Sequence, residues 1–165
     1  MNHRIKLLRE PWVIIMVGIP LSGKSTFIRE NFTDDNFEII SRDQLVMDVY
    51  GSDDYDKAFK NVNQGEVNRA LDKKLRDTAK NHENVIIDMT NLGKKRRRTH
   101  LAFYDDSYYK VAVVFPFLSD EEYKRRNEDR KEKENKFIPN HVLLNMKQSY
   151  QPVSIDEGFS RIINL

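Results

Sequence analysis

The segment Trp12–Thr26, with the sequence WVIIMVGIPLSGKST, constrains the fold more than any other part of the chain. Its apolar run, Val13–Val17, is typical of a parallel strand that is buried on both faces. The next eight residues, Gly18–Ser25, match the pattern G-x-x-x-x-G-K-[ST] at every fixed position. Such a loop aims backbone N–H groups at phosphate oxygens, and its glycines allow the tight turn that this requires. The sequence therefore predicts a nucleoside triphosphate site between a strand and a helix.

The residues of this loop have separate tasks in binding a triphosphate and its magnesium ion. Lys24 supplies a positive charge to the β- and γ-phosphates, and the Ser25 hydroxyl can ligate Mg²⁺. The helix that begins near Gly23 points the positive end of its dipole at the anion. We expect ATP to be held by six residues of the loop and the first helical turn: Gly18, Ser22, Gly23, Lys24, Ser25 and Thr26.

The composition is that of a polar globular domain. Of 165 residues, 39% are hydrophobic and 33% are charged, and no apolar run approaches the ~20 residues of a membrane span. The chain has no cysteine, which excludes disulfides and thiolate zinc sites and fits a reducing compartment. Residues 1–11 lack the apolar segment of a secretory signal. We expect a single domain over residues 1–165 that is cytoplasmic and does not contact a membrane.

Neither the histidines nor the net charge adds a second candidate site. The four histidines have no metal-ligand spacing and are expected on the solvated surface: His3, His82, His100 and His141. The formal net charge of +2 is too small to indicate nucleic acid by itself. Nothing in the sequence favours one oligomeric state over another.

Strand patterns alternate with helix patterns along the rest of the chain. Strands are predicted at Asn36–Ile40, Asn84–Asp88 and Tyr109–Phe115, with an edge strand at Phe159–Leu165. Helices are predicted at 44–49 with Asp43 as N-cap, at 54–80 as one helix or two, at 94–104, at 119–133 and at 141–150. The alternation predicts an α/β fold with a mostly parallel sheet covered on both faces. Ligands of such sheets bind at the carboxyl ends of the strands, where Gly18, Asp43 and Asp88 fall.

Two carboxylates at these strand ends narrow the chemistry that the triphosphate undergoes. Asp88 closes the strand VIID and resembles a Walker-B acid, which holds Mg²⁺ directly or through water. Asp43 follows the second strand, where it is either a general base for an acceptor hydroxyl or the cap of the next helix. Thr90 and Asn91, just after Asp88, either position the acceptor or Mg²⁺-bound waters, or simply form a turn.

Two charged segments have both a structural and a functional interpretation. Tyr123–Lys136, YKRRNEDRKEKENK, holds seven basic and four acidic residues. It is either a solvated helix with i,i+4 ion pairs or a lid, over about residues 119–138, whose arginines close over the triphosphate. The run Lys94–Arg98, KKRRR, is either a solvated helix start or one wall of a groove that binds a nucleic acid strand.

In combination, these segments resemble the kinase domain of the polynucleotide 5′-kinase family, in its phage and animal DNA-repair forms. The resemblance runs from about Val13 to Ile163 and is carried by five segments in order: GIPLSGKSTF, SRDQL, IIDMTN, RRNEDR followed by FIP, and SYQPVSIDEGFSRI. Many NTPases share the first segment, but the ordered set is far more specific. It implies a P-loop NTPase kinase fold with a helical lid, ATP as phosphate donor, Mg²⁺ as cofactor and nucleic acid as substrate.

The resemblance also implies roles for the matching residues. On the donor side, Lys24 and Ser25 would hold the phosphates and Mg²⁺, and Asp88 would support the coordination of the metal. Of the lid arginines, Arg126 and Arg130 are expected to contact ATP, and Arg130 would face the transferred phosphoryl group. Lys24 and Arg130 are therefore two of the three expected catalytic residues.

On the acceptor side, the resemblance makes Asp43 the third catalytic residue, as the base that activates a 5′-hydroxyl of DNA or RNA. Arg42 would help to place that acceptor, together with Thr90 and Asn91. One position departs from the family pattern, because phage forms carry a phosphate-contacting arginine where this chain has Val46. The family's phosphatase domain is not part of the match, so removal of 3′-phosphates is not expected.

The leading hypothesis is ATP-dependent transfer of the γ-phosphate to the 5′-hydroxyl of DNA or RNA. An alternative keeps the chemistry and changes the acceptor to a hydroxymethylated base, such as 5-hydroxymethyluracil, within phage DNA; the protein would then act in the host cytoplasm. Further alternatives are a small-molecule P-loop kinase, or a nucleotide-dependent switch for which Gln44 is the nearby candidate to position water.

Overall fold

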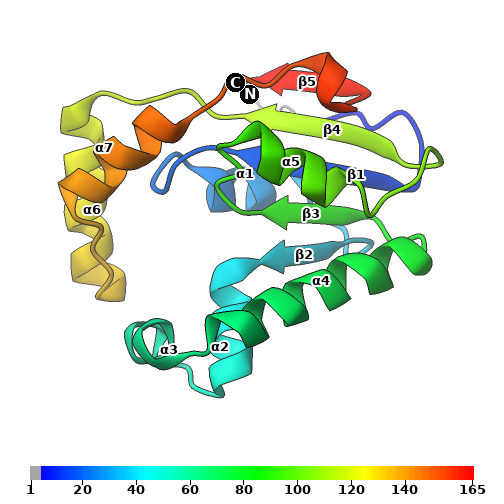
Figure 1. The fold of residues 1–165 in the computed structure, drawn as a ribbon. Coiled ribbons are helices and arrows are strands. Elements are labelled where there is room, and N and C mark those ends of the chain that lie inside the picture. Colours follow the sequence, from blue (N-terminus) through cyan, green and yellow to red (C-terminus); the bar gives the residue numbers. More distant parts are fainter. Residues whose placement is uncertain (1–4) are drawn as a thin grey trace.

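The computed structural model of the protein describes residues 5–165. Its centre is a parallel sheet of five strands in the order β2-β3-β1-β4-β5 (Figure 1). The strands are β1 (Trp12–Val17), β2 (Glu38–Ser41), β3 (Val85–Asp88), β4 (Tyr109–Val114) and β5 (Arg161–Asn164). The predicted α/β class is therefore confirmed, and Phe159–Leu165 contains an edge strand as expected.

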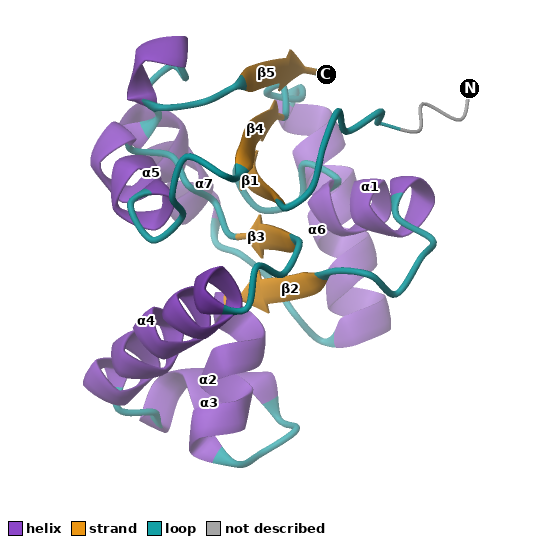
Figure 2. Ribbon diagram, turned by 90° about the vertical axis from the view of Figure 1, so that its right-hand side faces the viewer, coloured by secondary structure: helices purple, strands orange, loops and turns teal. Residues whose placement is uncertain are grey.

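Helices cover both faces of this sheet. They are α1 (Lys24–Asn31), α2 (Arg42–Tyr50), α3 (Tyr55–Asn61), α4 (Gln64–Lys80), α5 (Lys94–Leu101), α6 (Asp120–Glu134) and α7 (Asn140–Ser149), with a short 3₁₀ turn at Ile155–Glu157. Figure 2 shows α4 and α5 on one side of the sheet and α1 on the other. Helices α6 and α7 stand together beyond the carboxyl ends of the strands (Figure 1).

Strand β1 shows why the sequence produces two apolar layers. Its side chains alternate between the faces, and all six residues are buried. Val13, Ile15 and Val17 pack in the core under α2–α5, whereas Ile14 and Met16 pack in the layer on the α1 side. A third, smaller cluster joins α6 and α7 to the loops that follow β1 and β3; it contains Ile19, Leu92, Tyr123 and Leu143.

The start of α2 differs from the sequence prediction. Ser41 is the N-cap, and its hydroxyl accepts a hydrogen bond from the N–H of Gln44 at 3.5 Å. Asp43 therefore lies within the first turn of α2 instead of capping the helix. Its carboxylate is exposed and is not used as the cap. Gly51 ends α2 in the left-handed region, with φ 77°, as expected from the sequence. Val46, the position of the family arginine, is buried in the core at 1% exposure.

The segment 54–80 forms two helices, which was one of the two predicted forms. Asp54 caps α3 by accepting from the N–H of Lys57, and Asn63 caps α4 in the same way through Glu66. The short α3 is thereby set apart from α4 and held against α2. This separation matters because it gives α3 its own position at the edge of the site.

Helix α5 contains two corrections to the sequence analysis. His100 is 2% exposed rather than solvated, and burial together with the charge of Arg96 lowers its pKa to about 4. Arg97, inside the KKRRR run, is fully buried, so that run is neither a uniformly solvated helix start nor a continuous basic wall. His82 and His141 are exposed as predicted, and His3 lies outside the described residues. Within residues 5–165, no helix is long and apolar enough to cross a membrane.

Candidate nucleotide and acceptor site

The phosphate loop is fixed at its first glycine by the loop that follows β3. The N–H of Gly18 donates to the carbonyl oxygen of Thr90 at 3.0 Å. A Cβ at Gly18 would lie 2.8 Å from Ser22 Oγ and 3.0 Å from the Cβ of Phe115, so no larger residue fits there. Ser22 is buried, and its hydroxyl donates to the carbonyl oxygen of Ile19 at 2.7 Å, within the loop. Gly18 and Ser22 therefore shape the loop.

The far end of the loop exposes backbone donors at the start of α1. Leu21 and Gly23 have positive φ values, 71° and 97°, which turn successive peptide units into a concave nest for an anion. Gly23 caps α1 without a side-chain hydrogen bond, and the first turn of α1 carries no acidic residue. The N–H groups of that turn and the positive helix dipole thus face the nest. Ser25 and Thr26 lie exposed in the same turn.

Lys24 interacts electrostatically with the other charged residues of the site. Its Nζ donates to the carbonyl oxygens of Gly18 and Ile19 at 2.8 and 2.9 Å. Burial lowers the pKa of Lys24 to about 8, although Asp88 and Asp43 act in the opposite direction. The same interactions show that both carboxylates, and Arg130, lie close enough to Lys24 to affect its charge. The strand ends therefore bring together Lys24, Asp43 and Asp88, as the sequence predicted.

Ser25 and Asp88 suit a magnesium ion by the chemistry of their donors. A hydroxyl and a carboxylate are hard oxygen ligands, and Mg²⁺ is usually held by few protein oxygens together with substrate phosphates. Burial raises the pKa of Asp88, as does Asp43, while the charge of Lys24 lowers it. Asp88 ends β3 and does not cap α5, whose N-cap is Gly93. A nearby cation would therefore stabilise the ionised form of Asp88.

Asp43 has a partner that the sequence analysis missed. The hydroxyl of Tyr55, the first residue of α3, donates to Oδ1 of Asp43 at 3.1 Å. Burial and the charge of Asp43 raise the pKa of Tyr55 to about 12, so the phenol stays protonated and remains a donor. The only sequence signal for this contact is the helix pattern after Asp54, which does not show where α3 lies.

Three other predicted residues have mainly structural contacts. The Arg42 guanidinium donates to the side-chain oxygens of Asn68 and Gln64 at 3.0 and 2.7 Å, which ties α2 to α4. Asn91 is 2% exposed, and its amide donates to the carbonyl oxygen of Met16 at 2.7 Å behind the phosphate loop. Thr90 contributes its carbonyl oxygen to Gly18. The structure therefore brings these residues next to the site without placing Asn91 in its open part.

The lid helix α6 presents two of its three arginines to the site. Arg126 donates to the carbonyl oxygen of Leu21 at 3.0 Å, directly over the phosphate loop. Arg130, one turn further on, is a quarter exposed, and its charge affects both Lys24 and Tyr55. Arg125 is 64% exposed and is held on the outside of the helix by Glu122. This arrangement leaves Arg126 and Arg130 as the arginines that face the nucleotide side.

A buried ion pair joins the loop after β3 to the tail of the chain. Arg97 Nε lies 2.8 Å from Glu157 Oε1, and both side chains are 0% exposed. The same guanidinium donates to the carbonyl oxygens of Asn91, Leu92 and Gln151. Glu157 also accepts from the N–H of Ser154. The sequence analysis noted the tail only as a segment of the family resemblance, and it missed the pairing of Glu157 with Arg97.

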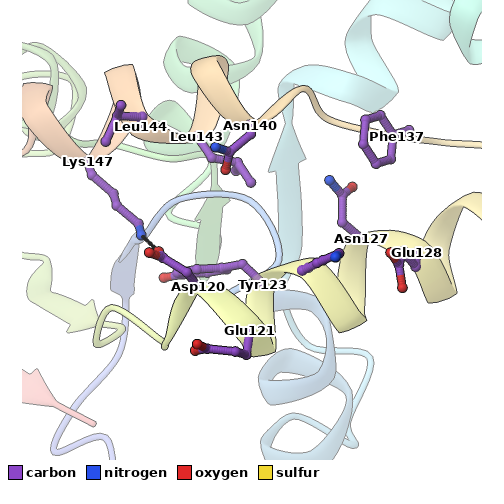
Figure 3. Close-up of a pocket in the computed structure, with 11 residues that line it drawn as sticks. Asp120, Glu121, Tyr123, Asn127, Glu128, Phe137, Asn140, Leu143, Leu144 and Lys147 are labelled. Atoms are coloured by element: carbon purple, nitrogen blue, oxygen red, sulfur yellow. Dashed lines mark hydrogen bonds and ion pairs between the residues drawn. The ribbon is translucent and has the colours of Figure 1, made fainter.

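Two hollows lie near these elements. A pocket of about 210 Å³ adjoins the phosphate loop and is lined by Gly18, Leu92, Phe117, Tyr150 and Leu165, among others. A larger pocket of about 660 Å³ lies between α6 and α7, where Phe137, Leu143 and Leu144 meet Asp120 and Lys147 (Figure 3). Neither Arg126 nor Arg130 lines the larger pocket, so it occupies a different face of the lid helix.

A phosphate loop after the central strand, two carboxylates at neighbouring strand ends and an arginine-bearing lid together define a class: the P-loop kinases. Kinases of this class generally use ATP and Mg²⁺. The chain belongs to the AAA_33 family, described as "AAA domain", which it matches over residues 13–153.

Solved structures show how widely this fold is used. A chain in the structure of the Pnkp1/Rnl/Hen1 RNA repair complex is 28% identical, with a TM-score of 0.67 over 87% of this chain and 45% of that one. Chaetomium thermophilum Kti12, solved with ADP-AlF3, is 19% identical with a TM-score of 0.61, covering 93% of this chain and 88% of that one. A gluconokinase from Sinorhizobium meliloti is 14% identical with a TM-score of 0.57, covering 95% and 83%.

Among curated proteins, heterogeneous nuclear ribonucleoprotein U-like protein 2 is similar. The mouse protein is 27% identical over 152 residues and the human protein 27% over 153 residues. The match covers 88% of this chain but only 20% of either relative, so the chain spans about a fifth of their length. The likeness is thus to one part of a much longer protein.

Proposed function

We propose that this domain transfers the γ-phosphate of ATP to the 5′-hydroxyl of a DNA or RNA strand. The observation that carries the proposal is the position of Asp43. Its exposed carboxylate lies close enough to Lys24 of the phosphate loop to raise the pKa of that lysine, and it accepts a hydrogen bond from the Tyr55 hydroxyl. Asp88 is the acid that would support the metal, and binding of ATP does not require a second one. We therefore assign Asp43 to the acceptor hydroxyl.

The proposed reaction forms one bond and breaks one. The acceptor oxygen bonds to the γ-phosphorus, the bond from that phosphorus to the β–γ bridging oxygen breaks, and ADP leaves. Asp43 accepts the proton of the acceptor hydroxyl as the new bond forms. Lys24 and Arg130 stabilise the charge on the transferred phosphoryl group and on the leaving oxygen. Bound Mg²⁺, next to Ser25 and Asp88, would neutralise charge on the phosphate oxygens.

The lid supports transfer to an acceptor rather than hydrolysis. Arg126 spans from α6 to the phosphate loop, so α6 covers the place where the γ-phosphate would lie. Such covering excludes water and favours a positioned hydroxyl as nucleophile. A nucleotide-dependent switch would use Gln44 to position water. The side-chain amide of Gln44 instead donates to Asp48 at 2.8 Å, on the exposed surface of α2, which disfavours the switch hypothesis.

A polynucleotide acceptor is supported by sequence and structural likeness together. The five ordered segments of the polynucleotide 5′-kinase resemblance all map onto the site or its supports, including the tail through Glu157. The chain of the RNA repair complex is 28% identical and supports a nucleic acid acceptor. The gluconokinase is 14% identical, and its likeness concerns the fold alone. The apolar pocket of about 210 Å³ beside Gly18 offers a place for the base of ATP.

The test is a transfer assay with γ-labelled ATP, Mg²⁺ and a panel of acceptors. The panel holds 5′-hydroxyl DNA and RNA oligonucleotides, the same strands with a 5′-phosphate, duplex DNA with 5-hydroxymethyluracil and blocked ends, and gluconate. Label on the 5′-hydroxyl strands alone is the expected result. Label on the modified duplex would move the acceptor to a base, label on gluconate would make the protein a small-molecule kinase, and label in free phosphate alone would contradict all three.

A further inference from the structure

Two aromatic side chains lie on the same face of α3, next to the acceptor side of the site. Tyr55 and Phe59 are one helical turn apart, with ring centroids 5.7 Å apart and ring planes inclined by only 28°. Phe59 is 54% exposed, a large apolar surface to leave in water. The anchor of α3 is Ala58, which lies next to Phe59 and is fully buried, together with Val62 just after the helix, which packs against the core. The fold therefore does not depend on the exposed ring of Phe59.

The position of this pair relative to Asp43 makes it more than a surface feature. The hydroxyl of Tyr55 bonds to the carboxylate of Asp43 at 3.1 Å, so the two rings extend outward from the proposed base. In a nucleoside, the base lies a short distance from the 5′-oxygen across the sugar. If the 5′-oxygen of an acceptor strand lies at Asp43, the terminal base of that strand would therefore lie beside the rings of Tyr55 and Phe59.

Positive charge from the lid lies on the same side. Lys136, just after α6, places its Nζ 4.8 Å from the centroid of the Tyr55 ring. In Figure 1 the C-terminal end of α6 lies near α3. Arg130 is also close enough to Tyr55 to affect its pKa. An aromatic surface with cations beside it is the combination that binds single-stranded nucleic acid, through base stacking and phosphate attraction.

We propose that Tyr55 and Phe59 form a stacking ledge for the nucleobase at the 5′ end of the acceptor strand. The proposal rests on the proposed function and names the feature by which the site recognises a nucleic acid. An acyclic sugar acid such as gluconate has no flat face to stack on these rings, whereas every nucleobase has one. The ledge predicts weak discrimination among the four bases, because stacking uses a face that all of them share.

The experiment combines a protein variant with a modified acceptor. Phe59→Ala removes the outer ring and Phe59→Trp keeps a stacking surface. Leu144→Ala is the control, since Leu144 is exposed to a similar degree, 51% against 54%, but lies on α7 and lines the pocket between α6 and α7. Each protein is assayed with a 5′-hydroxyl oligonucleotide and with the same strand carrying an abasic tetrahydrofuran residue at its 5′ end. Binding is followed separately by anisotropy of a 3′-labelled strand.

For the intact strand, Phe59→Ala is expected to raise the KM and the Kd by roughly 5- to 100-fold, the range that one stacked base supplies. The KM for ATP should be unchanged, Phe59→Trp should restore binding, and Leu144→Ala should behave as wild type. With the abasic strand, the wild-type protein should lose the same factor and Phe59→Ala should lose nothing further. A loss from Phe59→Ala that depends on the presence of the terminal base would distinguish stacking from a structural role of Phe59.

Two results would overturn the ledge. One is equal use of the intact and abasic strands by the wild-type protein; the other is an equal loss from Phe59→Ala with both strands. The proposed function fails separately: if the wild-type protein binds the strand with the predicted base dependence but does not phosphorylate it, the ledge stands and the reaction is wrong. If the wild-type protein neither binds nor phosphorylates the strands, both proposals fall.

Discussion

The donor side and the acceptor side of the site are built in different ways. On the donor side, backbone groups and buried contacts define the geometry: Gly18 bonds to Thr90, and Arg97 with Glu157 fixes the loop behind them. On the proposed acceptor side, side chains of α2 and α3 define it, above all the exposed Asp43 and the half-buried Tyr55. The difference teaches that in this chain the geometry for phosphate binding depends mainly on the backbone, whereas the geometry proposed for the acceptor depends on a few side chains.

The largest expected effects come from one substitution on each side. Lys24→Ala should abolish both nucleotide binding and transfer, because it removes the buried cation of the loop. Asp43→Asn should lower kcat by about 10²- to 10⁴-fold, the usual contribution of a general base, with nucleotide binding nearly unchanged. Titration with a fluorescent ATP analogue and single-turnover transfer measure the two effects. If Asp43→Asn also loses nucleotide binding, the separation into two sides is wrong.

The buried ion pair behind the loop should dominate stability. Arg97→Met leaves the carboxylate of Glu157 buried without its partner and should lower the free energy of unfolding by about 3–5 kcal/mol. The neighbouring Arg98→Met, at an exposed position of the same helix, is the control and should change it little. Urea denaturation measures both. The double variant Arg97→Met/Glu157→Met should recover part of the loss, and no recovery would mean that the carbonyl contacts of Arg97 matter more than the charge pair.

The lid connects the two sides, and its arginines should differ in effect. Arg130→Ala should lower kcat by about 10²- to 10³-fold if it stabilises the transferred phosphoryl group. Arg125→Ala should leave kcat within a few-fold of wild type, because Arg125 is 64% exposed on the outer face of α6. Steady-state kinetics at saturating ATP give the comparison. A large loss from Arg125→Ala with normal turnover of Arg130→Ala would reverse the assigned orientation of the lid.

A smaller effect concerns the stability of the fold around α5 and depends on pH. His100 is buried with its pKa lowered to about 4, so the unfolded chain binds its proton more readily than the folded protein does below pH 6.5. The stability due to neutral His100 is present above pH 6.5 and is lost as the pH falls toward 4, by about 2–3 kcal/mol. Urea unfolding across this range should show a shallower acid loss in His100→Leu, whereas exposed His141→Leu should follow wild type.

The strands and the phosphate loop could be predicted from the sequence because their signals are local. The run Val13–Val17 and the loop pattern fix the strand, the turn and the helix within fifteen residues. The positions of Asp43, just after β2, and Asp88, at the end of β3, followed from the same reasoning, because parallel strands end at one edge of a sheet.

What the sequence analysis missed depends on contacts between distant residues. Arg97 and Glu157 are sixty positions apart, and a basic run of five residues gives no sign that its fourth member is buried. Tyr55 bonds to Asp43 only because α3 is separated from α4 and packs back on α2. Ser41 caps α2 in place of Asp43 because both residue types are good caps and α2 begins at Arg42, directly after β2 ends at Ser41.

The most direct test of the account is a competition in one reaction. The wild-type protein receives γ-labelled ATP, Mg²⁺, a 5′-hydroxyl oligonucleotide and an excess of gluconate, and the labelled strand is digested to nucleotides. The account predicts that the label enters the strand, is recovered wholly on its 5′-terminal nucleotide, and is absent in Asp43→Asn. Label recovered on gluconate, or on an internal nucleotide of the strand, would contradict it.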